Sequence, residues 1–120
     1  MEKVFRVLGK SDWAISHDAG IVPPCGSDSR DGFIHLSRFE DIIDTANLYF
    51  DLSESPLVLE VDAEELGDKL RWEKVASRGG RSFPHLYSPG IPLTAVRATH
   101  SLTHDGTTFH LGSRSEVRDT

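Results

Sequence analysis

Residues 32–40 read Gly-Phe-Ile-His-Leu-Ser-Arg-Phe-Glu, and this stretch joins a strand pattern directly to a helix start. Its first half has the composition of a short strand, and Ser37 to Glu40 has the S-x-x-E form of a helix capping box. The apolar residues that follow recur as on one face of an α-helix. They are Phe39, Ile42 or Ile43, Ala46 and Phe50. A strand that leads into a helix predicts a domain that mixes the two.

The sequence before this stretch predicts one more strand and one more helix. Residues 4–8 form a short apolar run interrupted by Arg6, as expected of a strand. Ser11 can cap the helix that follows, and Ala19-Gly20 provides its stop. The segment between this helix and the next strand is rich in Pro, Gly and Ser, so we expect a loop there.

Four further strands are expected in the second half of the chain, at residues 57–62, 70–75, 93–104 and 107–111. Residues 62–67 should form a single helical turn, and residues 76–92 should form a long loop. Asp105-Gly106 is a preferred two-residue hairpin turn, so the last two strands should pair antiparallel. Many short strands with two main helices predict the α+β class, with much antiparallel sheet.

The length of the chain, 120 residues, suits one domain. We expect this domain to span residues 1–112 and the polar residues 113–120 to form a disordered tail. Residues 1–13 lack the apolar run of a signal peptide, and no stretch approaches the roughly 18 apolar residues of a membrane span. A single cysteine, Cys25, allows no disulfide within the chain and suits a reducing compartment. We therefore expect a cytoplasmic protein with no membrane partner.

The net charge of −6 argues against a nucleic-acid partner, because nucleic-acid binders carry a cationic surplus. The basic residues are nevertheless concentrated in one short stretch. Within it lie Lys69, Arg71, Lys74, Arg78 and Arg81. Such a run can be an ordinary solvated face, or it can be an anion site for a ligand that carries phosphate.

Two of the six histidines, His35 and His85, are candidates for a functional site. In a strand, His35 shares one face with Phe33 and Ser37, and Ser37 would lie at a helix N-terminus, where backbone N–H groups attract anions. A packed core histidine followed by an N-cap serine would give the same pattern. His85 lies in the run Phe-Pro-His-Leu-Tyr at residues 83–87, which can form a ligand wall or anchor the long loop to the core.

The other reactive side chains offer no metal site and no nucleophile. In the expected hairpin, His100 and His104 share a face but lie about 13 Å apart at roughly 3.3 Å per residue. His110 falls on the face opposite to His100. These spacings do not match those of known metal sites, so we expect no metal. Cys25 has no base near it in the sequence, which argues against a nucleophilic thiol.

Several uncommon sequence motifs in the chain resemble those of a bacterial family of domains of unknown function, DUF952. They are Gly-Phe-Ile-His-Leu-Ser at residues 32–37, with Trp13-Ala14 and Gly20 before it and Trp72-Glu73 and residues 83–87 after it. The likeness runs from about Val4 to about Leu102. It implies a fold similar to that of the ADP-ribosyltransferases, a split barrel of antiparallel strands around an NAD cleft.

A fainter likeness is to the RNA 2′-phosphotransferases, which use NAD to remove a phosphate from a tRNA splice junction. It rests on His35-Leu36-Ser37, Thr45-Ala46 and the run Val-Leu-Glu-Val-Asp-Ala at residues 58–63. In that family the matching histidine and serine face the ligand. The first strand departs from the family, because Val-Phe-Arg-Val at residues 4–7 replaces the expected His-Gly-Thr word. The likeness therefore implies the NAD cleft more than it implies an RNA substrate.

These resemblances imply a set of site residues. Arg6 would present a cation to NAD, and His35 and Ser37 would form the second motif. Glu73 would stabilise an oxocarbenium-like transition state, with His85 as the other contender for that position. The further residues implied in cofactor binding are Arg71, Arg81 and Tyr87.

The function implied is that of a domain that uses NAD as a co-substrate or binds an NAD derivative, as an ADP-ribosyltransferase or an NAD glycohydrolase. One alternative is a non-catalytic module that binds a nucleotide or another phosphorylated metabolite in the same cleft. A second alternative is phosphate transfer from RNA ends.

Overall fold

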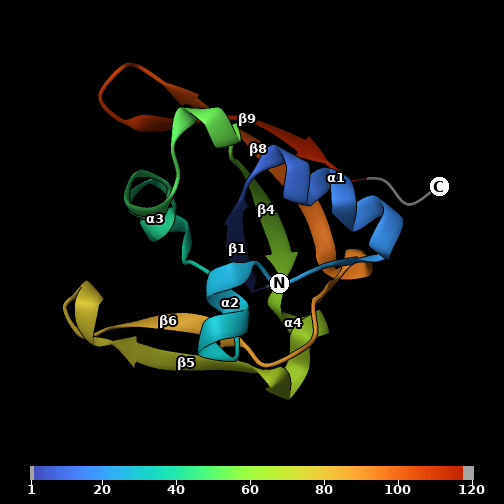
Figure 1. Cartoon of the computed structure of the whole chain (residues 1–120). Helices are drawn as coiled ribbons and strands as arrows, with labels where there is room; N and C mark the ends of the chain where they lie inside the picture. The colour runs from blue at the N-terminus through green and yellow to red at the C-terminus, as the bar shows by residue number, and fades with distance from the viewer. Residues whose placement is uncertain (1, 118–120) are drawn as a thin grey trace.

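The structure is a computed structural model that describes residues 2–117, and within them three antiparallel sheets are joined by short helices (Figure 1). The largest sheet has the order β1 (Lys3–Leu8), β4 (Leu57–Asp62), β8 (Val96–His104), β9 (Phe109–Glu116). The second has the order β3 (Ile34–His35), β6 (Arg81–Leu86), β5 (Leu70–Val75), and β2 (Ile21–Val22) pairs with β7 (Ile91–Pro92). The chain thus forms a single α+β domain, as predicted.

Short helices connect these strands. The α-helices are α1 (Lys10–Ala19), α2 (Gly26–Asp31), α3 (Ile42–Tyr49) and α4 (Ala63–Leu66). The 3-10 turns are η1 (Phe39–Asp41), η2 (Leu52–Glu54), η3 (Gly67–Lys69), η4 (Ala76–Arg78) and η5 (Leu93–Ala95). No helix among the described residues is long and apolar enough to cross a membrane.

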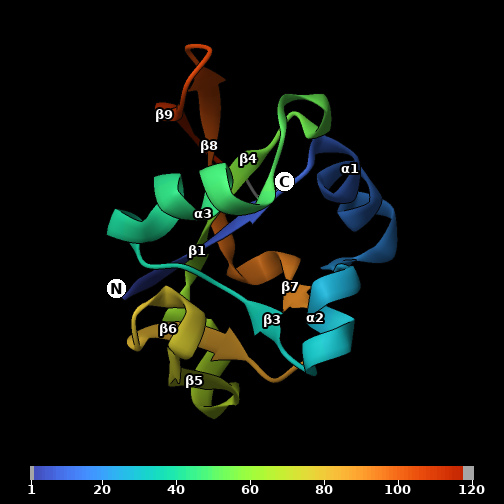
Figure 2. The same ribbon diagram turned by 60° about the vertical axis from the view of Figure 1, so that its left-hand side comes forward.

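Two apolar clusters lie on the two faces of the largest sheet, because successive side chains of a strand point to opposite faces. In β1, Val4 and Leu8 belong to the larger cluster, and Phe5 and Val7 belong to the smaller one. Helix α3 covers the smaller cluster and crosses β1 (Figure 2). Arg6 is buried on the same face of β1 as Val4, which directs its guanidinium toward the second sheet.

Several predicted elements are confirmed. Strands β1, β4 and β5 lie where the sequence predicts them. Helix α1 ends at Gly20, whose positive φ of 77° is the left-handed conformation that glycine adopts readily. Its N-cap is Gly9, so the prediction that Ser11 caps this helix is wrong. Asp62 caps α4, which is the expected single turn.

Two segments expected to be loops contain regular structure. Residues 21–31 include β2 and α2, and residues 76–92 include β6 and β7. Helix α2 has no apolar face, and Asp28 is its buried residue. Strand β6 is central in its sheet although Pro84 lies within it, and proline in a sequence argues against a central strand. Both elements therefore depend on tertiary contacts that local sequence patterns do not reveal.

The start of α3 also differs from the prediction. Ser37 does not cap a helix, because it forms an isolated antiparallel bridge with Phe5 of β1. This bridge keeps Ser37 extended, so the helix begins only after the turn η1. Phe39, expected on the buried face, lies in that turn and is 57% exposed. Ile42 and Ala46 are buried as predicted.

The last hairpin has a longer turn and a longer second strand than expected. His104 pairs with Phe109, so residues 105–108 form a four-residue turn rather than the two-residue turn Asp105-Gly106. The Asp105 carboxylate accepts hydrogen bonds from the backbone N–H groups of Thr107 and Thr108, which stabilises this turn. Strand β9 continues to Glu116, so residues 113–116 of the expected tail are in a strand. Residues 118–120 lie outside the described residues.

One short segment belongs to two sheets. His35 pairs with His85 in the second sheet, and Ser37, two residues later, bridges Phe5 in the largest sheet. The backbone N–H of Leu36 donates to the Pro84 carbonyl, but Pro84 has no N–H to donate in return. Pairing between β3 and β6 therefore ends here, and the chain passes from one sheet to the other.

The close approach of residue 90 to strand β2 gives a first prediction. A Cβ atom on Gly90 would lie 2.6 Å from Ile21 Cδ1 and 2.8 Å from the Val22 carbonyl oxygen. We expect Gly90→Ala to lower the free energy of unfolding by about 1–3 kcal/mol, measured by chemical denaturation. Gly26→Ala is the control, because a Cβ there meets no atom within 4 Å. Equal stability of the two variants would contradict the prediction.

Candidate functional site

A buried carboxylate, Asp28 of α2, connects the first strand to His35. Asp28 is 1% exposed, and it accepts hydrogen bonds from the Arg6 guanidinium and from the backbone N–H of Cys25. Its Oδ1 lies 2.6 Å from His35 Nδ1 and 3.0 Å from the His35 backbone nitrogen. Arg6 Nη1 also donates to the His35 carbonyl at 2.8 Å. Asp28 and Arg6 therefore fix both the backbone and the ring of His35.

The ionisation of Asp28 follows from these contacts. Burial alone would raise the pKa of Asp28, but the hydrogen bonds from His35 and Arg6 outweigh burial and hold the pKa well below its usual range. The carboxylate is therefore charged at neutral pH. It pairs with a guanidinium that is itself buried, so each group compensates the charge of the other.

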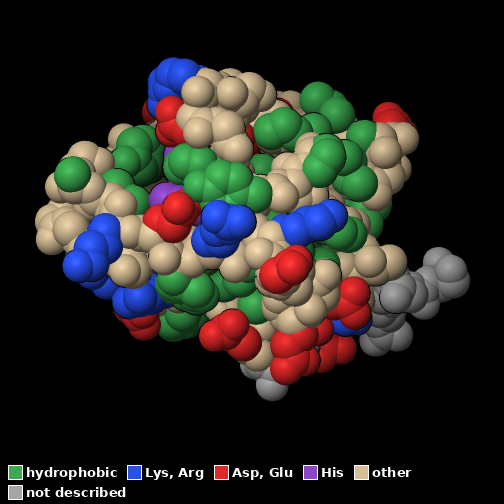
Figure 3. Space-filling model, turned by 90° about the horizontal axis from the view of Figure 1, so that it is seen from below, with side chains coloured by type: hydrophobic (Ala, Val, Ile, Leu, Met, Phe, Trp, Pro, Cys, Tyr) green, Lys and Arg blue, Asp and Glu red, His purple; other side chains and the backbone are tan. Residues whose placement is uncertain are grey.

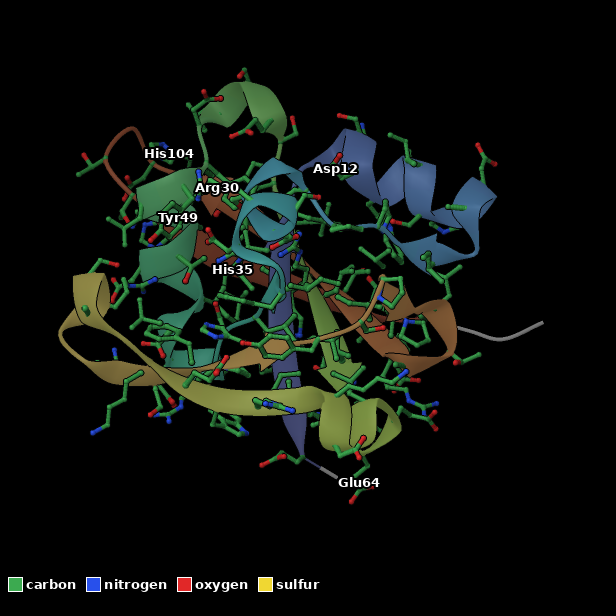
Figure 4. All side chains as sticks on the ribbon, turned by 60° about the horizontal axis from the view of Figure 1, so that its bottom comes forward. Asp12, Arg30, His35, Tyr49, Glu64 and His104 are labelled. Atoms are coloured by element: carbon green, nitrogen blue, oxygen red, sulfur yellow. The ribbon has the colours of Figure 1, made fainter. Side chains whose placement is uncertain are left out.

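The second ring nitrogen of His35 faces another carboxylate. His35 lies beside α2 (Figure 4), and its Nε2 is 2.9 Å from Oδ2 of Asp31, the exposed last residue of that helix. The pKa of Asp31 is lowered by hydrogen bonds, first from Arg30 and also from His35. Both carboxylates can accept from the ring only when both ring nitrogens carry protons. Movement of Asp31 would free Nε2 for a ligand while Asp28 still holds Nδ1.

A second histidine with a carboxylate behind it lies beside the first. His85 Nδ1 is 2.9 Å from Glu73 Oε1, and the Tyr87 hydroxyl donates to the same oxygen at 2.6 Å. These hydrogen bonds, the one from Tyr87 foremost, lower the pKa of Glu73, and the Glu73 carboxylate raises the pKa of Tyr87. The centroids of the His35 and His85 rings are 5.9 Å apart.

The ring of Phe33 joins these groups. It stacks on His85 with centroids 4.0 Å apart, and its centroid lies 4.7 Å from that of His35 and 5.5 Å from that of Tyr87. Directly opposite residues of antiparallel strands share a face, and His85 is opposite both His35 and Arg71. We call this surface the site face. It consists of Phe33, His35, Arg71, Glu73, His85 and Tyr87.

Arginine side chains lie over aromatic rings on and beside the site face. Arg71 lies over the Tyr87 ring at 5.3 Å, and Arg78 and Arg81 lie over the Phe83 ring at 4.5 and 5.8 Å. In the view from the side of β5 and β6, a histidine is visible at the surface beside acidic and basic side chains (Figure 3). The site face therefore presents imidazole, carboxylate and aromatic groups with cations nearby.

Five of the residues expected in the site lie on the site face, and three, Ser37, Arg81 and Arg6, do not. Ser37 is buried, and its Oγ lies 3.1 Å from Thr45 Oγ1. Arg81 lies four residues along β6 from His85, and its Nη1 is 2.6 Å from the buried Asp41 carboxylate. Arg6 contacts the site through Asp28 and the His35 backbone, with both of its terminal nitrogens hydrogen-bonded within the protein.

Sequence reasoning missed Asp28 and Asp31. Both lie in the segment expected to be a loop, so no structural element had been assigned to them. A signal for Asp28 was nevertheless present, because an acidic residue three positions after an N-cap residue can complete a capping box. Asp28 does so with Cys25.

The carboxylates and imidazoles of the site are placed for hydrogen bonding rather than for metal ligation. Among residues 2–117, no group of three or more His, Cys, Asp or Glu side chains is placed to hold a metal ion. Two imidazoles with a carboxylate at Nδ1 can instead donate, accept or transfer protons at the other ring nitrogen. The stacked aromatic rings can receive a planar group of a ligand.

Comparison with known proteins places the chain in a family. Residues 7–99 match the family model described as protein of unknown function (DUF952). The crystal structure of protein CC0527 from Caulobacter crescentus is similar with a TM-score of 0.81 and 33% sequence identity, over 91% of this chain and 94% of that one. The solution NMR structure of CC0527 has a TM-score of 0.74 and 34% identity, over 90% and 91% of the two chains.

No match was found among curated proteins. The family match covers most of the chain, and it includes every residue of the site face. The resemblance noted in the sequence words around His35 and His85 is thereby confirmed at the level of the family. The chain belongs to the DUF952 family of proteins of unknown function.

Proposed function

We propose that this domain binds NAD or an NAD derivative on the site face and cleaves the bond between nicotinamide and ribose. The observation that carries the proposal is the convergence of His35 and His85 on the ring of Phe33, with the Glu73 carboxylate hydrogen-bonded to His85. Two small antiparallel sheets, joined through residues 35–37, are compatible with the split barrel of the ADP-ribosyltransferases, which we propose as the fold type.

Each group of the site face has a role in this proposal. The nicotinamide ring stacks against Phe33 and Tyr87, and Arg71 binds a phosphate of the ligand. The bond between ribose C1 and the ring nitrogen breaks, and its electron pair leaves with nicotinamide. The Glu73 carboxylate stabilises the positive charge that develops on the ribose. A water molecule or an acceptor hydroxyl adds to C1 and releases its proton.

Arg6 takes a different part from the one the resemblance implied. Its guanidinium is buried against Asp28 and the His35 carbonyl, so we assign it the positioning of His35 rather than contact with pyrophosphate. Arg71 is an exposed cation that lies over the Tyr87 ring, beside the stacked rings. Arg81 pairs with Asp41 through Nη1 and is half-exposed, and we place it at the outer end of a bound nucleotide.

The experiment that tests the proposal is an amide NMR titration with NAD, ADP-ribose and nicotinamide. We expect saturable shifts at Phe33, His35, Glu73 and His85, with the same residues affected by nicotinamide and by NAD. The titration requires no knowledge of the acceptor. Absence of shifts at these residues with millimolar ligand would overturn the proposal.

His35 provides a variant for the same titration. We expect His35→Ala to weaken NAD binding about tenfold, as for loss of one charge-assisted hydrogen bond. The fold should persist, because Arg6 still pairs with Asp28 when the ring is removed. His110→Ala is the control, since His110 is exposed in the β8–β9 hairpin. If the His35 variant lost cooperative thermal unfolding, a packing role for His35 would replace the binding role.

A second candidate is a module that binds the same ligand without turnover. It is favoured by one observation, that Glu73 Oε1 already lies within hydrogen-bond distance of two side chains, His85 and Tyr87. A carboxylate held in this way can serve to orient His85 alone. Binding of NAD without cleavage would select this candidate, and the Glu73 variant described in the Discussion separates the two.

A further inference from the structure

A second cluster of charged side chains lies on the other face of the largest sheet. Lys3 and Phe5 point away from the face that holds Arg6, because side chains alternate along β1. Glu60 of β4 is directly opposite Phe5, and His100 of β8 is directly opposite Arg114 of β9. We call Lys3, Glu60, His100 and Arg114 the Glu60 cluster. It spans all four strands of the sheet.

Glu60 is the centre of this cluster. It is 2% exposed, and Arg114 donates to both of its oxygens, at 3.1 and 2.9 Å. His100 Nε2 lies 3.0 Å from Oε1, and Lys3 Nζ lies 3.1 Å from Oε2. The hydrogen bonds from Arg114, together with those from His100 and Lys3, lower the pKa of Glu60 to about 2. The carboxylate therefore holds three basic side chains in fixed positions.

An open cavity of about 570 Å³ lies against the Glu60 cluster. Its volume is within the range of about 300–1,000 Å³ that is typical of small-molecule sites. Besides the cluster, the cavity is lined by Phe5, Arg38, Phe39 and Glu40. Helix α3 packs on the neighbouring apolar part of this face, so the cavity lies beyond the start of that helix.

The lining of the cavity combines cations with an exposed ring. Phe39 is 57% exposed and meets the Phe5 ring edge to face, with centroids 5.6 Å apart. Arg38 stacks its guanidinium over Trp72 at 4.9 Å. Three cations, Lys3, Arg38 and Arg114, face two carboxylates, Glu40 and Glu60. The excess of one positive charge is present even with a neutral His100.

We propose that this cavity binds a small organic anion, a carboxylate or a phosphate monoester carried on a planar apolar body. The Glu60 carboxylate is surrounded by donors, whereas Lys3 keeps donors that Glu60 does not use. An anion at this end of the cavity completes the hydrogen bonding of Lys3 and Arg38. The planar body lies against Phe39, whose burial by the ligand supplies the apolar part of the binding energy.

The test is an NMR titration with four probes: phenyl phosphate, benzoate, inorganic phosphate and benzyl alcohol. We expect phenyl phosphate or benzoate to give saturable shifts at Phe39, His100 and Arg114, with none at His35 or His85. Comparison of these two probes distinguishes phosphate from carboxylate ligands. Inorganic phosphate and benzyl alcohol each lack one half of the ligand, so they should bind at least about tenfold more weakly.

Variants locate the binding. We expect Lys3→Gln and Phe39→Ala to weaken binding of the tighter probe about fivefold each, and Phe39→Ala to leave inorganic phosphate binding unchanged. Lys74→Gln is the control, because Lys74 lies on β5 outside the cavity. Three outcomes would each overturn the proposal. They are chemical-shift changes confined to the site face, binding that does not saturate at about 10 mM probe, and equal effects of Lys3→Gln and Lys74→Gln on binding. Failure of NAD to bind the site face would leave these readouts unaffected.

Discussion

Replacing Asp28 with Ala should lower the free energy of unfolding by about 3–5 kcal/mol, because the change leaves the buried Arg6 guanidinium without its carboxylate. The midpoint of thermal unfolding should fall by roughly 10–20 °C. Circular dichroism during heating and chemical denaturation both measure this loss. Asp31→Asn is the matched control on the same helix, and we expect it to cost less than about 1 kcal/mol because Asp31 is exposed.

A double variant tests the cause. If the cost of Asp28→Ala comes from the unpaired guanidinium, Arg6→Met combined with Asp28→Ala should lose less stability than the sum of the two single changes. Additive losses would show that Asp28 stabilises α2 through other contacts.

The ion pair between Asp28 and Arg6 also predicts how the stability of the fold depends on acid pH. The pKa of Asp28 is lower in the folded state than the value of about 3.9 for an unfolded aspartate. Its contribution is therefore fully present above the unfolded pKa, and it is lost as pH falls below about 4 toward the folded pKa. The difference in stability between the natural chain and Asp28→Ala should narrow in that window.

Replacing Glu73 with Gln should reduce NAD cleavage about 100-fold, because the amide cannot stabilise a developing positive charge as the carboxylate does. The amide oxygen can still accept from Tyr87 and His85, so the fold and NAD binding should change little. The rate of NAD cleavage is measured as the release of nicotinamide, which is monitored by chromatography with the enzyme in excess over NAD.

Glu64→Gln is the matched control, because Glu64 is an exposed acidic residue on α4, outside the site face, and it lies well apart from His35 in Figure 4. Equal cleavage by the Glu73 and Glu64 variants would assign Glu73 to the orientation of His85. If the natural chain binds NAD and neither it nor any variant cleaves NAD, the non-catalytic module is the correct function.

The parts of the fold that the sequence predicted are those with strong local patterns. Strand β1 has four apolar residues in five positions, and α1 ends at a glycine that adopts a positive φ. Helix α2 has neither feature. Its six residues contain no apolar face, and an isolated helix of that length is unstable in water. Its stability comes from Asp28, whose partners lie on β1 and β3.

The candidate site could be predicted only in part from the sequence, for the same reason. His35, Glu73 and His85 lie in sequence motifs that a family resemblance could align. The Asp28 carboxylate, which contacts the His35 ring, comes from α2, a helix that was not predicted. Strand β6 was missed because Pro84 lies at its centre, although its neighbour Leu36 donates to the Pro84 carbonyl and completes that part of the ladder. Contacts between distant segments decide both cases.

The segment shared by the two sheets gives a reason for the spacing of the His-Leu-Ser word. His35 supplies the imidazole of the site, whereas Ser37 holds the chain against Phe5 and stays outside the site. A residue inserted between them would either move His35 out of reach of Arg6 or break the bridge to β1. The His-Leu-Ser sequence therefore sets a distance as well as supplying functional groups. The bridge that Ser37 forms with β1 determines how far the His35 imidazole lies from the first strand.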